Sequence, residues 1–377
     1  SKPSASLSRW TRITARCTVQ PVTTPIPTIS AAMLLRGLPV RTIGCGRTTY
    51  VWLVMTSERM NRLFHSRGLA RIAGLLAVLP GLLFAADLPT GSYSQSLILD
   101  TGLSLPSDVA VGHDGAIYVV NGGNHEIAVF NRNGLRIATL GTQGSEPGEL
   151  FEPVGIDIGP SGEIYVADKG NQRLQVYAAN GSFLRELPLK DEEGEEVDPV
   201  DVAVSADGTE LFVSANNSHR ILVFSSGGRL LRGWGSEGED QGEFRYPATI
   251  DLDARGNVLV VDVLNQRVQK FDAEGNFLLS FGGLGGKPGT LFRPKGIAVD
   301  ASGQSYVSDS FLGAIQVFDA NGELVHVLGA DGVASVFETP VGMTIDGSRL
   351  LVVQMLPGNV RSLDTASSAR APAEEQP

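Results

Sequence analysis

Residues 164–184 read IYVADKGNQRLQVYAANGSFL and contain three short apolar runs separated by polar turns. The runs IYVAD and LQVY are rich in Val, Ile and Tyr, and an Asn-Gly pair precedes the third run, which begins at Phe183. Short runs of this composition between turn residues are typical of antiparallel strands. Similar text recurs at 211–231 and 258–278, so the segment belongs to a repeat.

A proline opens each repeat, and successive prolines are 46 to 48 residues apart. The prolines are Pro106, Pro153, Pro199, Pro247, Pro294 and Pro340. Each is followed by an alternating apolar run that adds a fourth strand to the three described above. Four strands in a period of about 47 residues are typical of propeller blades. A helical solenoid would need apolar residues at 3.6-residue spacing, and that pattern does not persist here.

Closure of the ring sets the number of blades. Five repeats are complete, whereas the sixth supplies only three strands and ends at Leu363. One further strand, at 94–101, precedes the first repeat. As the outer strand of the sixth blade it would close the ring and remove an open edge. The sequence therefore predicts an all-β, six-bladed β-propeller of four-stranded antiparallel blades over residues 94–363, closed by an N-terminal strand in the last blade.

The charge is divided unevenly along the chain of 377 residues, whose net charge is −11. Residues 1–86 hold eleven Lys/Arg and one acidic residue, a net +10, so the other nineteen Lys/Arg and forty acidic residues give 87–377 a net −21. From Met60 a basic stretch leads into an apolar run ending at Phe84 and a pair of alanines. This order predicts a signal peptide, and the apolar run is too short to span a bilayer.

These boundaries predict an exported protein, periplasmic or secreted, without a stable membrane anchor after cleavage of the signal peptide at 60–86. Residues 364–377 are expected to form a disordered tail. Residues 1–59 fit either an upstream extension of a chain whose translation starts at Met60, or a disordered tail. Peptides from 1–59 in mature exported protein would contradict the first alternative.

Composition excludes several classes of protein. The chain has two cysteines, Cys17 and Cys45, which excludes a disulfide scaffold, a cysteine-based zinc module and an iron–sulfur protein. Nucleic-acid binding is not expected, because affinity for phosphate backbones comes from clustered Lys and Arg. The sequence predicts a monomer that binds a protein or peptide partner, with a small ligand as an alternative.

The repeats resemble those of the NHL family, in which an apolar run ending in Asp is followed by an Asn-His-Arg-like turn. The glycine-rich links GTQGSEPGELFEPVGI and GGLGGKPGTLFRPKGI are also similar to those of that family. The resemblance covers about 105–363. It departs at Leu312-Gly313-Ala314 and at Pro357-Gly358-Asn359, which replace the Asn-His-Arg-like turn. The resemblance implies a binding platform, although similar propellers include a peptide-amidating lyase and calcium-dependent lactonases.

Candidate binding residues lie where loops gather. In a propeller, the link between blades and the turn between the second and third strands of a blade lie on one rim, called here the top rim. Such loops commonly bind ligands. The candidates on this rim are Asn121, Asn124, His125, Lys169, Asn171, Asn216, Asn217, His219, Asn265, Lys295 and Asp309.

Four other residues on this rim are predicted to be structural. Asp168 with Arg173, and Asp262 with Arg267, recur at identical repeat positions. A charged hydrogen bond across the turn would brace it. We therefore expect these pairs to stabilise turns rather than to bind a ligand.

The link before the third blade is strongly acidic and forms a candidate docking loop. Its acidic residues are Asp191, Glu192, Glu193, Glu195 and Glu196. Such a loop attracts a basic protein, a peptide or a cation. The alternative is that these side chains are simply solvated.

Four aspartates mark the innermost strands: Asp108, Asp157, Asp201 and Asp251. They are weak candidates for a cation site such as calcium, which needs several oxygen ligands. The alternative is that they accept hydrogen bonds from backbone amides or channel water, and the sequence predicts no required cofactor.

The sequence favours a non-catalytic scaffold that docks a ligand on its top rim. The alternative is a cation-dependent hydrolase or lyase, lactonase-like or amidating-lyase-like, that uses the central channel. No catalytic residue is predicted. The sequence has no GxSxG or HExxH motif, and its histidines after residue 86 are too dispersed for a three-histidine zinc site.

Overall fold

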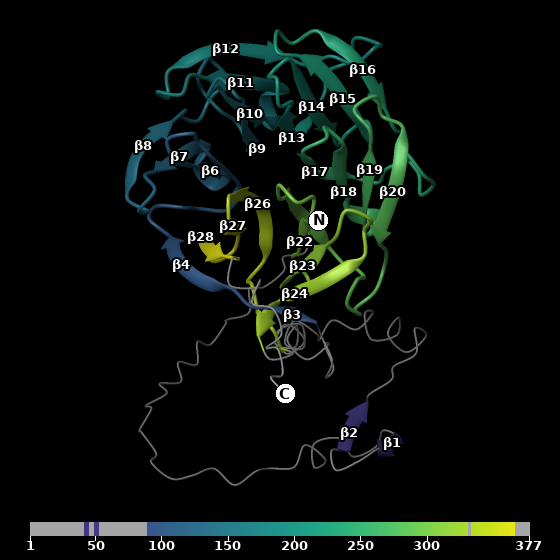
Figure 1. Ribbon diagram of the computed structural model, residues 1–377. Coiled ribbons are helices and arrows are strands. Elements are labelled where there is room, and N and C mark those ends of the chain that lie inside the picture. Colours follow the sequence, from purple (N-terminus) through teal and green to yellow (C-terminus); the bar gives the residue numbers. More distant parts are fainter. Residues whose placement is uncertain (1–40, 45–48, 53–88, 331–332, 366–377) are drawn as a thin grey trace, which may run out of the picture. The chain divides into compact units, whose positions relative to one another are not determined.

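The computed structural model describes residues 41–44, 49–52, 89–330 and 333–365 and divides the chain into two units, Ser1–Ala73 and Gly74–Pro377 (Figure 1). In the first unit, β1 (Arg41–Gly44) pairs antiparallel with β2 (Thr49–Trp52), a hairpin that the sequence pattern does not predict. The predicted signal peptide lies outside the described residues, as do residues 366–377 of the predicted tail. Among the described residues, no helix is long and apolar enough to cross a membrane.

The second unit contains a ring of six sheets, each built on four antiparallel blade strands (Figure 1). Blade 1 consists of β5 (Pro106–Val111), β6 (Ile117–Asn121), β7 (Glu126–Phe130) and β8 (Arg136–Leu140). Blade 2 consists of β9 (Pro153–Ile158), β10 (Ile164–Asp168), β11 (Arg173–Tyr177) and β12 (Phe183–Pro188). Blade 3 consists of β13 (Pro199–Val204), β14 (Glu210–Ala215), β15 (Arg220–Ser225) and β16 (Leu230–Trp234).

Blades 4 to 6 follow the same order. Blade 4 consists of β17 (Pro247–Leu252), β18 (Val258–Asp262), β19 (Arg267–Phe271) and β20 (Phe277–Gly282). Blade 5 consists of β21 (Pro294–Val299), β22 (Ser305–Asp309), β23 (Ala314–Phe318) and β24 (Leu324–Ala330). Blade 6 consists of β26 (Pro340–Asp346), β27 (Arg349–Gln354), β28 (Asn359–Asp364) and the N-terminal strand β4 (Ser94–Leu99). The predicted all-β, six-bladed fold is confirmed.

Closure of the ring by the N-terminal strand is also confirmed. The strand β4 pairs antiparallel with β28, with Leu99 opposite Val360 and Ser94 opposite Asp364. Pairing the two ends of the propeller in one sheet holds the ring shut and covers the edge that β28 would otherwise expose.

Blade 5 carries two short additions that the sequence pattern does not predict. The strand β3 (Thr90–Gly91) pairs parallel with β24, and β25 (Val333–Ala334) pairs antiparallel with it. Val327 N donates to Pro89 O at 2.8 Å. Gly91 is required at this crossing, because a Cβ there would lie 2.2 Å from the His326 ring. Two-residue strands are too short to leave a periodic signal in the sequence.

The core lies between neighbouring blades. Between blades 2 and 3, for example, Tyr165 and Val176 pack in one cluster with Val213 and Phe224. Each sheet therefore buries its faces against its neighbours, as stacked repeats do. The resulting rigid ring supports two places for function, the loops of the rims and the central channel.

Candidate functional site

The top rim is assembled by hydrogen bonds between each link and the turn that it crosses. Gly123 N donates to Ser104 O at 2.9 Å in blade 1. Gly170 N donates to Phe151 O at 2.8 Å in blade 2. Because the same contact recurs around the ring, the loops that the sequence placed on one rim do lie together.

The two predicted bracing pairs form the expected ion pairs. The Asp168 carboxylate accepts hydrogen bonds from Arg173 Nε at 2.9 Å and from Phe151 N at 2.7 Å. Asp262 likewise accepts from Arg267 Nε at 2.9 Å and from Arg245 N at 2.8 Å. Both carboxylates are completely buried, so each ties a turn to the link before its own blade.

Two predicted binding residues belong to the same bracing system, which corrects their assignment. Asn121 is completely buried, accepts a hydrogen bond from Ser104 N at 2.6 Å and donates to Glu126 Oε1 at 2.6 Å. Asp309 is completely buried and accepts from the backbone N–H of Phe292 and Leu312. Neither side chain is presented to a ligand.

Two more predicted binding residues also contact the buried brace carboxylates. Asn171 Nδ2 donates to Asp168 Oδ2 at 2.8 Å, and Asn265 Nδ2 donates to Asp262 Oδ2 at 2.8 Å. Each amide also donates to a carbonyl of the preceding link. These asparagines are therefore part of the turn's internal structure.

Blade 3 lacks the bracing carboxylate. Ala215 stands at the position of Asp168 and Asp262, at the end of the second strand. The donors that would meet a carboxylate there, Ser218 Oγ and Arg220 Nε, are buried without a hydrogen-bond partner among the described residues. The Arg220 guanidinium turns instead to a carboxylate of the preceding link.

Replacing Ala215 with Asp is expected to stabilise the protein. The new carboxylate would give acceptors to Ser218 Oγ and Arg220 Nε, and an unsatisfied buried donor costs about 1–3 kcal/mol. We expect the free energy of unfolding to rise by about 1 kcal/mol, measured by urea denaturation. Ala215→Asn, which keeps the size without the charge, is the matched control. A fall in stability with Asp would contradict this account of blade 3.

Both predicted rim histidines contact the link that enters the following blade. His125 Nδ1 accepts a hydrogen bond from Glu152 N at 3.0 Å, and its ring stacks on Phe151 at 5.3 Å. His219 Nδ1 accepts from Tyr246 N at 3.2 Å, with its ring edge-on to Tyr246. Each histidine therefore helps to hold an aromatic side chain on the rim.

The remaining predicted rim residues are more open. Asn124 and Asn217 are exposed, and Lys169 and Asn216 are half-buried. Lys295 lies at the start of the innermost strand of blade 5, where burial, together with nearby Arg293, lowers its pKa. Asn217 accepts a hydrogen bond from Asp198 N at 3.2 Å and donates to Glu196 O at 3.3 Å, so it also holds the preceding link in place.

The top rim also carries exposed apolar side chains that the sequence analysis did not select. We use the name apolar rim for those that stand one or two residues before a repeat proline or in the turn between the second and third strands. Its members are Leu105, Phe151, Tyr246, Leu264, Phe292, Phe311 and Leu356. They come from blades 1, 2, 4, 5 and 6, whereas blade 3 contributes none. Four of the seven stand just ahead of a repeat proline, a positional signal that could have identified them.

Phe292 and Phe311 form the densest part of the apolar rim. Their rings stack with centroids 4.1 Å apart, yet the residues remain 40% and 52% exposed. Elsewhere on the rim, Leu105 and Tyr246 have φ values of +44° and +60°. Glu152 and Thr339 also have positive φ at the same place, directly before a repeat proline, so this backbone conformation belongs to the repeat.

The acidic docking loop borders the gap in the apolar rim. Glu193, Glu195 and Glu196 are exposed. Glu192 is already engaged, because both of its oxygens accept hydrogen bonds from Arg220 at 2.7 and 3.0 Å. The Asp191 carboxylate accepts from the backbone N–H of Glu193 and Glu195 and so shapes the loop. Asp191 and Glu192 therefore stabilise the loop, whereas the side chains of Glu193, Glu195 and Glu196 are exposed to solvent.

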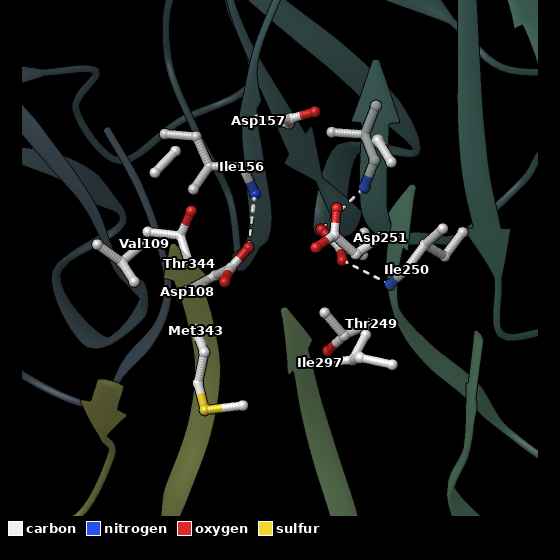
Figure 2. Close-up of a pocket in the computed structure, with 14 residues that line it drawn as sticks. Asp108, Val109, Ile156, Asp157, Thr249, Ile250, Asp251, Ile297, Met343 and Thr344 are labelled. Atoms are coloured by element: carbon white, nitrogen blue, oxygen red, sulfur yellow. Dashed lines mark hydrogen bonds between the residues drawn. The ribbon is translucent and has the colours of Figure 1, made fainter. Parts of the chain in front are cut away.

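In the channel, the aspartates join neighbouring blades. Asp108 accepts a hydrogen bond from Ile156 N of blade 2 at 3.0 Å, and Figure 2 shows its carboxylate turned toward that amide. Asp201 accepts from Ile250 N of blade 4 at 2.9 Å. Gly342 is needed beside Asp108, since a Cβ there would lie 2.2 Å from the carboxylate oxygen.

Asp157 and Asp251 also join neighbouring blades by accepting backbone hydrogen bonds. Asp157 accepts from Val204 N of blade 3, and Asp251 accepts from Val299 N of blade 5, both at 2.7 Å. Their second oxygens accept from the next residue of their own strand at 2.7 Å. We call Asp108, Asp157, Asp201 and Asp251 the channel carboxylates.

Burial makes these four carboxylates hard to ionise. It raises the pKa of Asp108 to about 8, of Asp157 to about 6 and of Asp251 to about 7. Burial, with the nearby charge of Asp108, raises the pKa of Asp201 well above its usual range. Removing a carboxylate from water favours its neutral form, and neighbouring carboxylates add to this effect.

The channel offers a poor cation site. Its cavity of about 50 Å³, lined by all four channel carboxylates, has room for only a few water molecules. Among the described residues, no group of three or more His, Cys, Asp or Glu side chains could hold a metal ion. Oxygens that already accept backbone hydrogen bonds, on groups that resist ionisation, do not suit a cation that needs six to eight oxygen ligands.

Comparisons with known proteins support the fold. A family model described as a 6-bladed beta-propeller matches residues 105–203. A streptogramin B lyase structure is similar with a TM-score of 0.55 and 14% identity, covering 72% of this chain and 97% of that one. A gluconolactonase structure from Xanthomonas campestris is similar with a TM-score of 0.57 and 13% identity, covering 74% of this chain and 96% of that one.

A catalytically inactive virginiamycin B lyase from Staphylococcus aureus with quinupristin gives a TM-score of 0.52 and 14% identity, covering 74% of this chain and 96% of that chain. No curated protein matches the sequence. At these identities the similarity is one of fold.

Proposed function

We propose that the protein is an exported, NHL-type binding platform that docks a protein or peptide on its top rim without catalysing a reaction. The observation that carries the proposal is the apolar rim. A soluble surface that gathers exposed aromatic and aliphatic side chains on rigid loops is typical of a protein interaction site. The ring beneath supplies the rigidity, since buried carboxylates fix the turns to the links.

Charge indicates what kind of partner fits. The exposed glutamates of the acidic docking loop lie at the polar gap in the apolar rim. A partner with apolar anchor residues and a basic flank would satisfy both features. Aromatic anchors at Phe292 and Phe311 would supply most of the affinity, and the acidic loop would raise the rate of association.

Truncating the stacked pair is expected to weaken docking strongly. In Phe292→Ala/Phe311→Ala, partner affinity should fall by about 30-fold or more, because loss of a central aromatic anchor costs about 2 kcal/mol or more. Capture of partners from the native exported fraction, followed by titration of the captured partner, measures this. Leu135→Ala removes an apolar residue that is even more exposed, at 66%, from a hairpin turn away from the top rim and is the control. Equal capture by both variants would contradict the proposal.

The alternative, a cation-dependent hydrolase or lyase that works in the channel, predicts a different result. The purified protein would contain one divalent cation per chain, and Asp108→Asn would release it. Elemental analysis of the two proteins distinguishes the alternatives. The tight hydrogen bonding of the channel carboxylates is the reason we favour the binding platform.

A further inference from the structure

The link that enters blade 5 differs in charge from the links that enter the other blades. Residues 283–293 contain Lys287 and Arg293 and no Asp or Glu, whereas each of the other five links contains at least one acidic residue. Lys295 follows at the start of the innermost strand β21. We call Arg293 and Lys295 the basic pair. It lies on a propeller that is acidic overall.

Lys295 occupies a position that carries no charge in the other blades. In blades 1, 2, 3, 4 and 6 the residue after the repeat proline is Ser107, Val154, Val200, Ala248 and Val341. Because the innermost strands line the channel and start at the top rim, this position surrounds the upper mouth of the channel. Lys295 O accepts a hydrogen bond from Thr249 Oγ1 of blade 4 at 2.6 Å, which fixes the lysine backbone there.

The basic pair has no counter-charge among the described residues. The ion pairs of this part of the chain are formed by other arginines and by Lys270. Glu338, the exposed acid of the following link, therefore pairs with neither member. Deeper in the channel, the channel carboxylates are hard to ionise and do not cancel the positive charge.

Both members of the basic pair can be reached from solvent. Arg293 is exposed. The buried side-chain donors without a partner lie elsewhere in the described ranges, so the amine of half-buried Lys295, which has no hydrogen-bond partner there either, is open to solvent. Burial, together with the charge of Arg293, lowers the pKa of Lys295. An anion between the two would stabilise both charges.

The stacked rings of Phe292 and Phe311 adjoin the basic pair. The buried Asp309 carboxylate accepts hydrogen bonds from Phe292 N at 2.6 Å and from Arg293 N at 3.1 Å. Ser310 N, next to Phe311, donates to Arg293 O at 3.0 Å. One buried carboxylate and the turn above it therefore hold two exposed rings and an exposed guanidinium side by side.

We propose that this surface binds the C-terminal carboxylate of a peptide whose last residue is apolar. The carboxylate would lie between Arg293 and Lys295, and the last side chain would pack against Phe292 and Phe311. A terminal residue carries a carboxylate and a side chain on the same Cα, which suits a surface where cations adjoin aromatic rings. A guanidinium matches a carboxylate in geometry, and capture of a terminal carboxylate is a recurring mode of peptide recognition.

The inference rests on the proposed docking function and names the part of the partner that is recognised. The basic flank expected at the acidic docking loop would then lie upstream of the terminus. An extended polyanion such as a nucleic acid fits less well, because the surface offers two cations on an acidic domain rather than a row of them.

Two arrays of random decapeptides test the proposal, one with free carboxyl ends and one with amidated ends, each probed with the full chain. We expect binding to the first array, with an apolar last residue selected, and binding weaker by about tenfold or more when the tightest peptide is amidated. Equal binding of both forms would overturn the inference and leave the docking function standing. Absence of binding to both arrays would contradict peptide docking itself, and the inference with it.

Substitutions of the basic pair locate the site. Lys295→Met keeps the apolar stem and removes the charge, and Arg293→Gln removes the charge at an exposed position. Each should weaken the free-carboxyl peptide by about tenfold or more and leave the amidated peptide unchanged. Arg229→Gln, which removes an exposed cation from a hairpin turn away from the top rim, is the matched control. Unchanged affinity in both variants would overturn the inference.

The melting temperature separates a binding role of Lys295 from a structural one. Because its half-buried charge has no partner among the described residues, Lys295→Met should melt at or above the temperature of the parent. A lower melting temperature with unchanged affinity for the free-carboxyl peptide would show that the lysine serves the fold. Arg293→Gln leaves the packing around Lys295 in place, so it tests the site even if Lys295→Met unfolds.

Discussion

Raising the pH from 5 to 8 is expected to lower the free energy of unfolding, because the channel carboxylates bind protons more tightly in the folded chain than in the unfolded one. Burial raises the pKa of Asp108 to about 8, of Asp251 to about 7 and of Asp157 to about 6. In the unfolded chain these groups ionise near pH 4.

The direction of the effect follows from proton linkage. Below pH 4 both states are protonated, so the stabilisation from neutral channel carboxylates is complete. As the pH rises, the unfolded state loses its protons first, and stability falls until each folded group has also ionised, near pH 6 to 8. Each such group costs about 1.4 kcal/mol for every pH unit in its window.

Urea denaturation at pH 5, 6, 7 and 8 measures this trend. Asp108→Asn removes one ionisable channel group, keeps an acceptor for Ile156 N and should flatten the slope by about 1.4 kcal/mol for each pH unit. Asp100→Asn, at an exposed position, is the matched control and should leave the slope unchanged. Burial lowers the pKa of His326, so the titration of this histidine acts in the opposite direction. Stability that rises from pH 5 to 8 would contradict the prediction.

Asp168→Ala is expected to be the most damaging substitution on the top rim. It removes the buried partner of Arg173, whose side chain is 9% exposed, and leaves Phe151 N without its acceptor. Breaking one side of a buried ion pair costs about 3–5 kcal/mol. The melting temperature of a domain of this size should fall by roughly 6 °C or more. Thermal unfolding followed by circular dichroism measures this loss.

Blade 1 supplies a control that rebuilds the brace with other groups. There the carboxylate is replaced by Asn121 and the arginine by Glu126, and the two side chains share a hydrogen bond. Asp168→Asn alone would place amide hydrogens against the guanidinium of Arg173. In blade 1, however, Glu126 is also paired with Arg136, whereas Arg173 in blade 2 is also paired with Glu186. A full copy of blade 1 therefore needs Asp168→Asn/Arg173→Glu/Phe183→Arg/Glu186→Thr, which should recover part of the lost stability. Strictly additive effects of Asp168→Ala and Arg173→Ala would show that these two residues do not act as a pair.

The repeat pattern predicted two of the bracing carboxylates on the top rim, but it did not predict the other residues that brace the turns. Asp168 and Asp262 were recognisable because arginine follows each at the same distance. Asn121 and Asp309 occupy the same repeat position without that arginine, so the sequence pattern suggested free binding residues. Their burial depends on the link some 17 residues earlier in the chain folding back across the turn, a contact that no local pattern encodes.

The sequence by itself determined the repeat, the strands and the closure of the ring, because strand alternation, turn residues and a period of about 47 residues are all local properties. The net charge of −11, a sum over a basic N-terminal region and an acidic propeller, had little bearing on function by comparison. Only the tertiary structure decided which polar groups form hydrogen bonds inside the protein and which side chains remain exposed. The channel carboxylates accept hydrogen bonds from residues 47 to 49 positions away in other blades, and the apolar rim gathers side chains from the loops of five blades.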